Sequence, residues 1–156
     1  LSAKSTDLVI GEVTLDKVVR EAIHKYARLF VRKKIKMELS SIDTQVLTDE
    51  KWLEFVIEQI LSNAIKYTAG GTISVYLKEE PEQETKELVI EDTGIGIAPE
   101  DLPRIFEKGY TGYNGHADKR STGIGLYLCR KIMRKLFHEI TIESEIGVGT
   151  KVHLKM

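Results

Sequence analysis

Two pairs of glycines flank one polar stretch of this chain, and their spacing suits a site for a phosphate-bearing ligand. Gly94 and Gly96 follow an apolar run, and Gly123 and Gly125 open a helical pattern. Backbone without a Cβ can approach a ligand closely, and the unpaired N–H groups of a helix N-terminus attract anions. The polar residues 109–121 then predict a flap over the ligand. Neither common phosphate-binding fingerprint is complete, so simple turn formation remains an alternative role for these glycines.

A second set of chemically capable side chains falls within residues 50–67, where apolar residues recur at helical spacing. At about 100° per residue, Gln59, Asn63 and Lys66 share one shoulder of this helix, with Tyr67 beside them. Amide oxygens are neutral ligands that suit Mg²⁺, and a lysine supplies a point charge for phosphate. The alternative is the ordinary polar flank of an amphipathic helix.

The composition is typical of a soluble globular protein and limits the possible functions. The chain has 156 residues, 42% hydrophobic and 30% charged, which suits one domain with a substantial core. Its net charge of -1 does not support binding of nucleic acid through bulk charge. Cys129 is the only cysteine, which excludes an internal disulfide. No apolar run approaches the roughly 20 residues needed to span a bilayer, so we do not expect this domain to be membrane-inserted.

The order of helical and alternating patterns predicts the fold that positions these residues. The helix over 50–67 is expected to be capped by Asp49 and stopped by Gly70-Gly71. Further helices are expected over residues 15–32, 99–106 and 123–137, and strands over 36–40, 45–48, 72–78, 88–91, 140–144 and 151–155, with Asp43 in the first turn. This succession predicts an α/β (α+β) two-layer sandwich. A mixed, largely antiparallel sheet of about five strands would be covered on one face by about three helices.

Five segments resemble, in order, the motifs of the catalytic domain of sensor histidine kinases. Residues 58–67 are similar to the N box of that family, Asp92-x-Gly94-x-Gly96 to its G1 box, and residues 104–107 to its F box. Residues 122–126 resemble its G2 box, and 147–150 its last glycine motif. The resemblance covers roughly residues 49–156. It implies the Bergerat ATP-binding fold, which is shared with DNA gyrase, heat-shock chaperones and mismatch-repair ATPases.

On the adenine side, the resemblance implies a role for each matching residue. Asp92 would accept a hydrogen bond from the exocyclic amine of adenine, a contact that selects adenine over guanine. Gly94 and Gly96 would leave room for the base, and Ile97 would pack against it. Thr150, from the last glycine motif, would complete this part of the ATP-binding set.

On the phosphate side, the resemblance implies a Mg²⁺ site and a lid. Asn63 would ligate Mg²⁺ with Gln59 beside it, while Lys66 would stabilise phosphate and Tyr67 would reach phosphate or ribose. Residues of the G2 box would offer backbone N–H groups to the phosphates: Thr122, Gly123, Ile124, Gly125 and Leu126. The ATP lid would span 109–121, and its candidate contacts are Gly109, Tyr110, Lys119, Arg120 and Ser121.

The kind of reaction follows from the residue at position 59. Hydrolytic relatives of the gyrase and chaperone type carry a glutamate four residues before the magnesium-binding asparagine, as the base for the attacking water. This chain has Gln59 there, and an amide cannot take a proton at neutral pH. We therefore expect little ATP hydrolysis by the chain alone. A hydrolytic ATPase, a serine kinase of the anti-sigma-factor type and a non-catalytic nucleotide-sensing module are the alternatives.

No phospho-acceptor histidine is evident, so no proton-transfer residue is assigned. The four histidines, His24, His116, His138 and His153, lack the sequence context of the acceptor in the family. The resemblance therefore implies the ATP-binding catalytic half of a kinase whose dimerisation and phospho-acceptor domain is absent here. Residues 1–156 would form this one domain, and residues 1–14 would be the connection to the missing half.

The amino-acid sequence around the predicted lid resembles that of one subfamily. Residues 106–112 and 121–128 are similar to the small intramembrane-sensing kinases that pair with peptide-antibiotic transporters or respond to cell-envelope stress. The implied partners are the kinase's own dimerisation domain, a response regulator whose aspartate receives the phosphoryl group, and a transporter complex. The implied location is the cytoplasmic side of a bacterial cell membrane.

Overall fold

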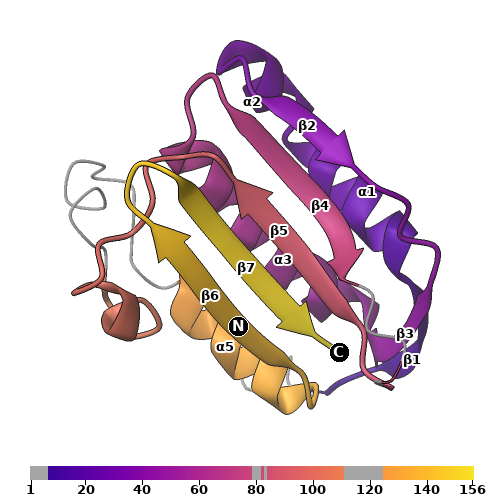
Figure 1. The fold of residues 1–156 in the computed structure, drawn as a ribbon. Coiled ribbons are helices and arrows are strands. Elements are labelled where there is room, and N and C mark those ends of the chain that lie inside the picture. Colours follow the sequence, from indigo (N-terminus) through magenta and orange to yellow (C-terminus); the bar gives the residue numbers. More distant parts are fainter. Residues whose placement is uncertain (1–6, 79–81, 83, 111–124) are drawn as a thin grey trace.

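A five-stranded sheet with helices behind it forms the body of the protein (Figure 1). The computed structural model describes residues 7–78, 82, 84–110 and 125–156. The sheet has the order β2 (Lys36–Leu39), β4 (Thr72–Lys78), β5 (Glu87–Asp92), β7 (Gly149–Lys155) and β6 (Glu139–Glu145), and it is covered by α1 (Leu15–Lys25), α3 (Glu50–Tyr67) and α5 (Gly125–Lys135). The predicted two-layer sandwich with about five strands and three covering helices is confirmed.

The pairing of the strands brings polar side chains together at one end of the sheet. β2 pairs with β4 in parallel, and the other neighbours are antiparallel, so the sheet is mixed but largely antiparallel. Side chains alternate between the two faces, and Ile73, Ile90 and Leu154 are buried against the helices. In the same register Asp92, at the end of β5, lies opposite Thr150 at the start of β7. A carboxylate and a hydroxyl are thereby brought to the helix-facing side of the sheet.

α3 is the central helix and packs against both α1 and α5. The Asp49 side chain accepts the N–H of Trp52 (3.0 Å), which confirms the predicted N-cap. Its apolar stripe is almost fully buried, with Leu53, Ile57 and Leu61 showing no exposed surface. Because this stripe fixes the rotation of the helix, the polar shoulder beside it must face the end of the sheet.

The N-terminal region differs from the prediction in two ways. The helix expected over 15–32 breaks at Tyr26, whose φ is -105°, into α1 and the short α2 (Ala27–Arg32). The strands expected over 36–40 and 45–48 do not share a sheet, because β3 (Gln45–Asp49) pairs with β1 (Ile10–Thr14) in a separate ribbon. β1 was not predicted, because its partner β3 lies more than 30 residues further along the sequence. The burial of Val13 opposite Val46 explains why the ribbon forms.

Two later helices are shorter than predicted. Residues 99–106 give only a 3₁₀ turn at Leu102–Arg104, because Pro103 lacks the N–H that an α-helix interior needs. α5 ends at Lys135 and starts, within the described residues, at Gly125. None of the helices built from the described residues combines the length and the apolar character required to cross a bilayer.

Candidate nucleotide-binding site

A pocket opens between the C-terminal half of α3, the helix-facing side of β5, β6 and β7, and the start of α5. Its lining is mostly apolar and includes four side chains with a polar group, from Asn63, Tyr67, Asp92 and Thr150. The other lining residues are Ile60, Ala64, Ile90, Gly96, Ile97, Leu126, Ile142 and Val152. Seven of the residues predicted to bind ATP are therefore brought together, namely Asn63, Tyr67, Asp92, Gly96, Ile97, Leu126 and Thr150. An apolar slot with a few convergent polar groups suits a flat heterocycle.

Asp92 is the buried charge of this pocket. It is 9% exposed, and its Oδ1 accepts the N–H of Gly94 at 2.9 Å. Burial raises the pKa of Asp92, although hydrogen bonds from the backbone N–H groups of Gly94 and Thr150 act in the opposite direction. A carboxylate held in this way is largely buried and has acceptor capacity to spare, so a bound N–H donor would stabilise its charged form.

The glycines after Asp92 are required by protein packing. A Cβ on Gly94 would collide with the backbone carbonyl of Tyr67, which also accepts the N–H of Ile95 (3.1 Å). Gly96 has φ 78°, and a Cβ there would strike the carbonyl of Glu145. The loop is thus wedged between the end of α3 and the β6–β7 turn. This packing fixes Asp92, and it is a reason for the glycines that the sequence did not reveal.

Ser144 holds the same loop from the other side and was missed in the sequence. Its Oγ accepts the N–H of Ile97 (2.8 Å) and donates to the carbonyl of Gly149 (2.9 Å). It also lies 2.7 Å from Thr150 Oγ1. A signal was available, because Ser144 occupies the helix-facing phase of β6, in which Ile140 is buried and Ile142 packs against the core. A polar residue in an apolar row indicates a structural hydrogen bond.

The polar shoulder of α3 lies where it was expected, along the pocket and towards α5. Asn63 lines the pocket. Gln59 is half-buried, and its Oε1 would lie 3.2 Å from a Cβ placed on Gly125. Lys66 is not among the lining residues, and its Nζ lies 5.5 Å from the centroid of the Tyr67 ring. The shoulder therefore runs from the pocket, at Asn63, to the first described turn of α5, at Gln59.

The C-terminus of α3 is held by a cation that the sequence analysis did not single out. Lys33 Nζ donates to the carbonyl of Ile65 and to that of Lys66 (3.2 Å). Burial lowers the pKa of Lys33. A positive charge at this end of a helix meets the negative end of the helix dipole and satisfies carbonyls that have no partner within the helix. Lys33 thereby holds the last turn of α3, next to the Tyr67 carbonyl against which Gly94 packs.

The predicted lid can be described only at its first residues. Six of the residues predicted to contact the phosphates or to form the lid lie outside the described residues: Lys119, Arg120, Ser121, Thr122, Gly123 and Ile124. Tyr110 does not line the pocket. Burial, together with a hydrogen bond to Asp101, raises the pKa of Tyr110 to about 12, and its ring lies 5.3 Å from the Arg104 guanidinium. Phe106 packs against the core beneath Arg130.

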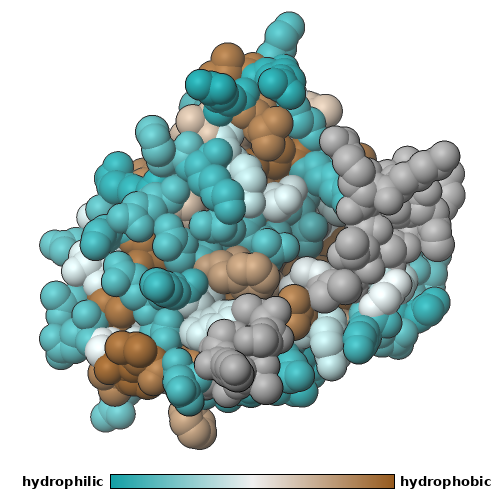
Figure 2. All heavy atoms as spheres, turned by 180° about the vertical axis from the view of Figure 1, so that it is seen from behind, coloured by the Kyte–Doolittle hydropathy of each residue, from teal (hydrophilic) through white to brown (hydrophobic). Residues whose placement is uncertain are grey.

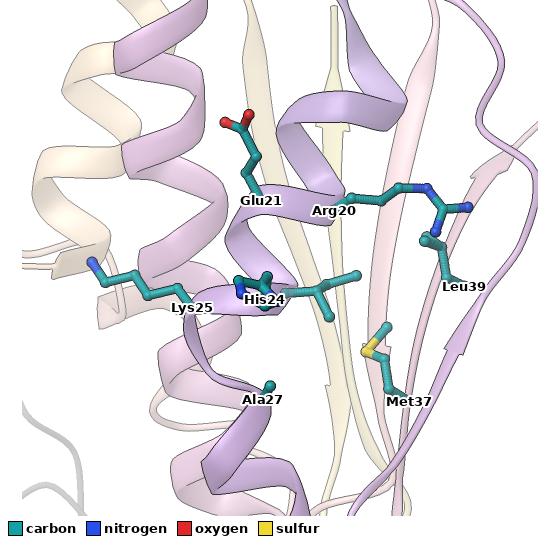
Figure 3. Close-up of a pocket in the computed structure, with 8 residues that line it drawn as sticks. Arg20, Glu21, His24, Lys25, Ala27, Met37 and Leu39 are labelled. Carbon is teal, nitrogen blue, oxygen red and sulfur yellow. The ribbon is translucent and has the colours of Figure 1, made fainter.

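A second hollow lies at the other edge of the sheet, between α1 and β2 (Figure 3). Met37 and Leu39 point from β2 towards α1, Arg20 reaches towards Leu39, and Lys25 points the other way (Figure 3). Two of its cations are paired on α1 and α3, because Arg20 contacts Asp16 (2.8 Å) and Lys25 contacts Glu58 (2.7 Å). The hollow has an apolar floor and no converging set of polar groups.

Comparison with known proteins identifies the family. Residues 48–156 match the family described as histidine kinase-, DNA gyrase B- and HSP90-like ATPases. The sensor histidine kinase YxdK of Bacillus subtilis is 37% identical over 147 residues, covering 94% of this chain and 45% of that protein. The sensor protein kinase GraS of Staphylococcus aureus is 34% identical over 155 residues, covering 99% of this chain and 44% of that protein. The chain therefore spans less than half the length of these relatives.

Solved structures share the fold. The mycobacterial sensor histidine kinase MprB superposes with a TM-score of 0.79 at 24% identity, covering 95% of this chain and 97% of that one. Full-length ShkA, solved in complex with AMPPNP, gives a TM-score of 0.80 at 21% identity, covering 97% of this chain and 31% of that one.

Proposed function

The chain belongs to the family of histidine kinase-, DNA gyrase B- and HSP90-like ATPases, and on that basis we propose that it transfers the γ-phosphoryl group of ATP to a histidine on a separate dimerisation domain. As a domain, it is the ATP-binding catalytic domain of a two-component sensor histidine kinase. The observation that carries the proposal is the convergence of Asn63, Tyr67, Asp92 and Thr150 in one pocket whose remaining lining is apolar.

Asp92 would read the base. Its buried carboxylate is an acceptor with no proton to give when ionised, so it suits the exocyclic amine of adenine. Guanine presents a carbonyl oxygen at the same position, and two acceptors would then face each other without water. Ile97 and Ile142 would sandwich the ring system, because both line the slot beside Asp92.

The phosphate end would be built by α3 and α5. Among the described residues, no group of three or more His, Cys, Asp or Glu side chains could hold a metal ion. An ion bound by Asn63, with Gln59 beside it, would take its remaining ligands from phosphate and water, as Mg²⁺ usually does. When bound, Mg²⁺ would neutralise phosphate charge. Lys66 and the backbone N–H groups around Gly125 and Leu126 would add positive potential.

The lid and its residues complete the proposed site. Residues 109–121 would close over the nucleotide, with Lys119, Arg120 and Ser121 near the phosphates, and Thr122, Gly123 and Ile124 would offer backbone N–H groups. Tyr67 would contact phosphate or ribose from the end of α3. We propose that residues 1–156 form one domain, and that residues 1–14 connect it to the dimerisation domain.

Gln59 favours phosphoryl transfer to another domain over hydrolysis. Its amide oxygen faces the start of α5, where a hydrolytic enzyme would need a base beside its water. We expect the Gln59→Glu variant to hydrolyse ATP at least tenfold faster than the wild type, because a carboxylate supplies the missing base. Phosphate release measures this rate, and a Gln59→Ala variant is the control. Equal rates for the three proteins would show that Gln59 does not suppress hydrolysis.

The wider assignment follows the relatives, which are named as sensor kinases. We propose a response regulator as the final acceptor, a peptide-antibiotic transporter as a partner, and the cytoplasmic side of a bacterial membrane as the location. Mixing the chain with the dimerisation domain of its parent kinase and ATP labelled at the γ-phosphate tests the reaction. Acid-labile, base-stable label on a histidine supports the proposal. Label released only as free phosphate would identify a hydrolytic ATPase instead.

A further inference from the structure

The groove between α1 and β2 is bordered by a strand whose outer edge pairs with no other described strand. β2 is the last strand of the sheet, and within the described part of the chain it pairs only with β4, in parallel. The N–H groups of Lys36 and Ser40 both donate to carbonyls on the β4 side, so every second residue of β2 faces β4. The N–H and carbonyl groups of Met37 and Leu39 therefore point away from the sheet, where another extended chain could pair with them.

The same two residues form the floor of the groove. Met37 and Leu39 are half-buried, and their side chains point from β2 towards α1 (Figure 3). The opposite wall comes from α1 and the first residue of α2, which contribute Arg20, Glu21, Ile23, His24, Lys25 and Ala27. An extended chain added to β2 would place every second side chain in this groove, because neighbours on one face of a sheet point the same way. The volume of about 840 Å³ has room for several such side chains.

One end of the groove is apolar and basic. α2 lies at the end of the molecule where β2 begins (Figure 1). Seen from behind, that end shows apolar spheres set among hydrophilic ones (Figure 2). Val31 is 80% exposed and follows Ala27 by one helical turn, so the apolar wall of the groove continues onto α2. The exposed cations beside it have no ion pair with a described residue: Arg28, Arg32 and Lys34. Their charge is complementary to acidic side chains.

We propose that the groove binds an extended peptide of a partner protein, which adds a strand to β2. The peptide carries apolar side chains at alternate positions and acidic residues at the end that lies beside α2. Hydrogen bonds to the backbone of Met37 and Leu39 give affinity, the groove selects the apolar side chains, and the cations of α2 select the acidic end. A helix does not suit this edge, because its backbone groups are already paired within it. The inference goes beyond the proposed function and does not depend on it.

An NMR titration of the isotope-labelled chain tests the groove. The probe is a short peptide of alternating valine and threonine with a pair of glutamates at each end. We expect the amide signals of Met37 and Leu39 to shift and their exchange with water to slow at least tenfold, because these N–H groups gain acceptors. The matched control is the same peptide methylated on its backbone nitrogens, which keeps the side chains but has no N–H to donate. It should bind at least tenfold more weakly.

Three results would overturn the proposal. The first is equal affinity for the two peptides, and the second is a titration that leaves the signals of Met37 and Leu39 unchanged. The third is a shift of these signals when the concentration of the chain alone is raised, because a second copy of the chain would then be the occupant of the groove.

A charge reversal tests the acidic end of the peptide. Arg28→Glu combined with Arg32→Glu should weaken binding of the glutamate-flanked peptide at least fivefold and strengthen binding of a lysine-flanked one, because the electrostatic attraction changes sign. Both residues are exposed, so the variant should fold. Arg134→Glu combined with Lys135→Glu, exposed on the last turn of α5, is the matched control and should leave both affinities unchanged. The same order of affinities in the wild type and the α2 variant would overturn the acidic partner.

ATP binding separates this proposal from the proposed function. Both double variants should bind ATP as tightly as the wild type, because the nucleotide pocket lies between α3, α5 and the other strands of the sheet. Failure of the wild-type chain to bind ATP would contradict the proposed function, whereas loss of peptide binding alone would overturn only the groove.

Discussion

Two hollows in the described part of the chain can be compared, and the larger of the two carries less chemistry. The groove between α1 and β2 has a volume of about 840 Å³, against about 70 Å³ for the pocket between α3, the sheet and α5. The groove has an apolar floor, and its cations Arg20 and Lys25 are neutralised by neighbouring carboxylates. The pocket instead buries a carboxylate, Asp92, whose only hydrogen bonds in the described structure come from backbone N–H groups.

The two hollows differ in how firmly the residues around them are held in place. Around the pocket, a loop is fixed at three places, by the carbonyl of Tyr67, by Ser144 and by the β6–β7 turn. The groove is bordered by the short edge strand β2, by α1 and by the start of α2, and half-buried side chains fill its floor. A site that must recognise one ligand needs polar groups held in place, and the packing around Asp92 supplies that rigidity. Volume alone does not identify such a site.

The largest effect is expected from the substitution Gly94→Ala, which adds a Cβ to the loop that follows Asp92. Gly94→Ala would place a Cβ against the Tyr67 carbonyl, so we expect it to lower the free energy of unfolding by about 2 kcal/mol or more and to abolish ATP binding. Urea denaturation and calorimetric titration measure the two effects. Gly11→Ala in β1 is the matched control, because no atom lies within 4 Å of its added carbon. Equal stability of both variants would contradict the wedged-loop account.

The next effect is the pH dependence of adenosine binding. Burial raises the pKa of Asp92, so this carboxyl takes up a proton at a higher pH than an ordinary aspartate. Binding to the charged form should therefore weaken by about tenfold per pH unit below that pKa, and bound adenosine should lower it. Titrations with adenosine, which has no phosphate to titrate, isolate the effect. Asp92→Asn should bind weakly at every pH. A wild-type affinity that stays constant on acidification would rule out a charged Asp92 as the acceptor.

The smallest expected effect concerns the groove. Met37→Ala removes part of its floor, and we expect the affinity for ATP to change by less than twofold, because the groove and the pocket lie at different edges of the sheet. The free energy of unfolding should fall by about 1 kcal/mol, since Met37 is only half-buried. A large loss of ATP affinity in a folded variant would show that the two hollows are coupled.

Much of the fold could be predicted because it depends on local signals. The Asp49 cap, the stripe from Leu53 to Ala64 and the strand alternation from 72 onward each follow from neighbouring residues. The β1–β3 ribbon could not be predicted, because it depends on pairing between Val13 and Val46, which are distant in the sequence. The break at Tyr26 was missed as well, because the apolar spacing continues through it. The helix predicted over residues 99–106 was wrong for a different reason. Pro103 in the sequence already argued against an α-helix there, and only a 3₁₀ turn forms.

The candidate site divides in the same way. Asn63 and Tyr67 followed from the helical period, and Asp92 and Thr150 from the motifs, and the structure brings all four to one pocket. Ser144 and Lys33 were missed, because both act on backbone groups that approach them only in the folded chain. The reason why Gly94 and Gly96 are glycines also became clear only from what lies beside them.

The most direct test of the account is calorimetric titration of Mg-ATP and Mg-GTP into the wild-type chain and the Asp92→Ala variant. A hydrogen bond to a charged group contributes about 1.5–3 kcal/mol, so the wild type should prefer ATP by roughly 10- to 100-fold, and the variant should lose that preference. Equal binding of the two nucleotides by the wild type, or a preference for ATP that survives in the variant, would contradict the claim that Asp92 reads adenine.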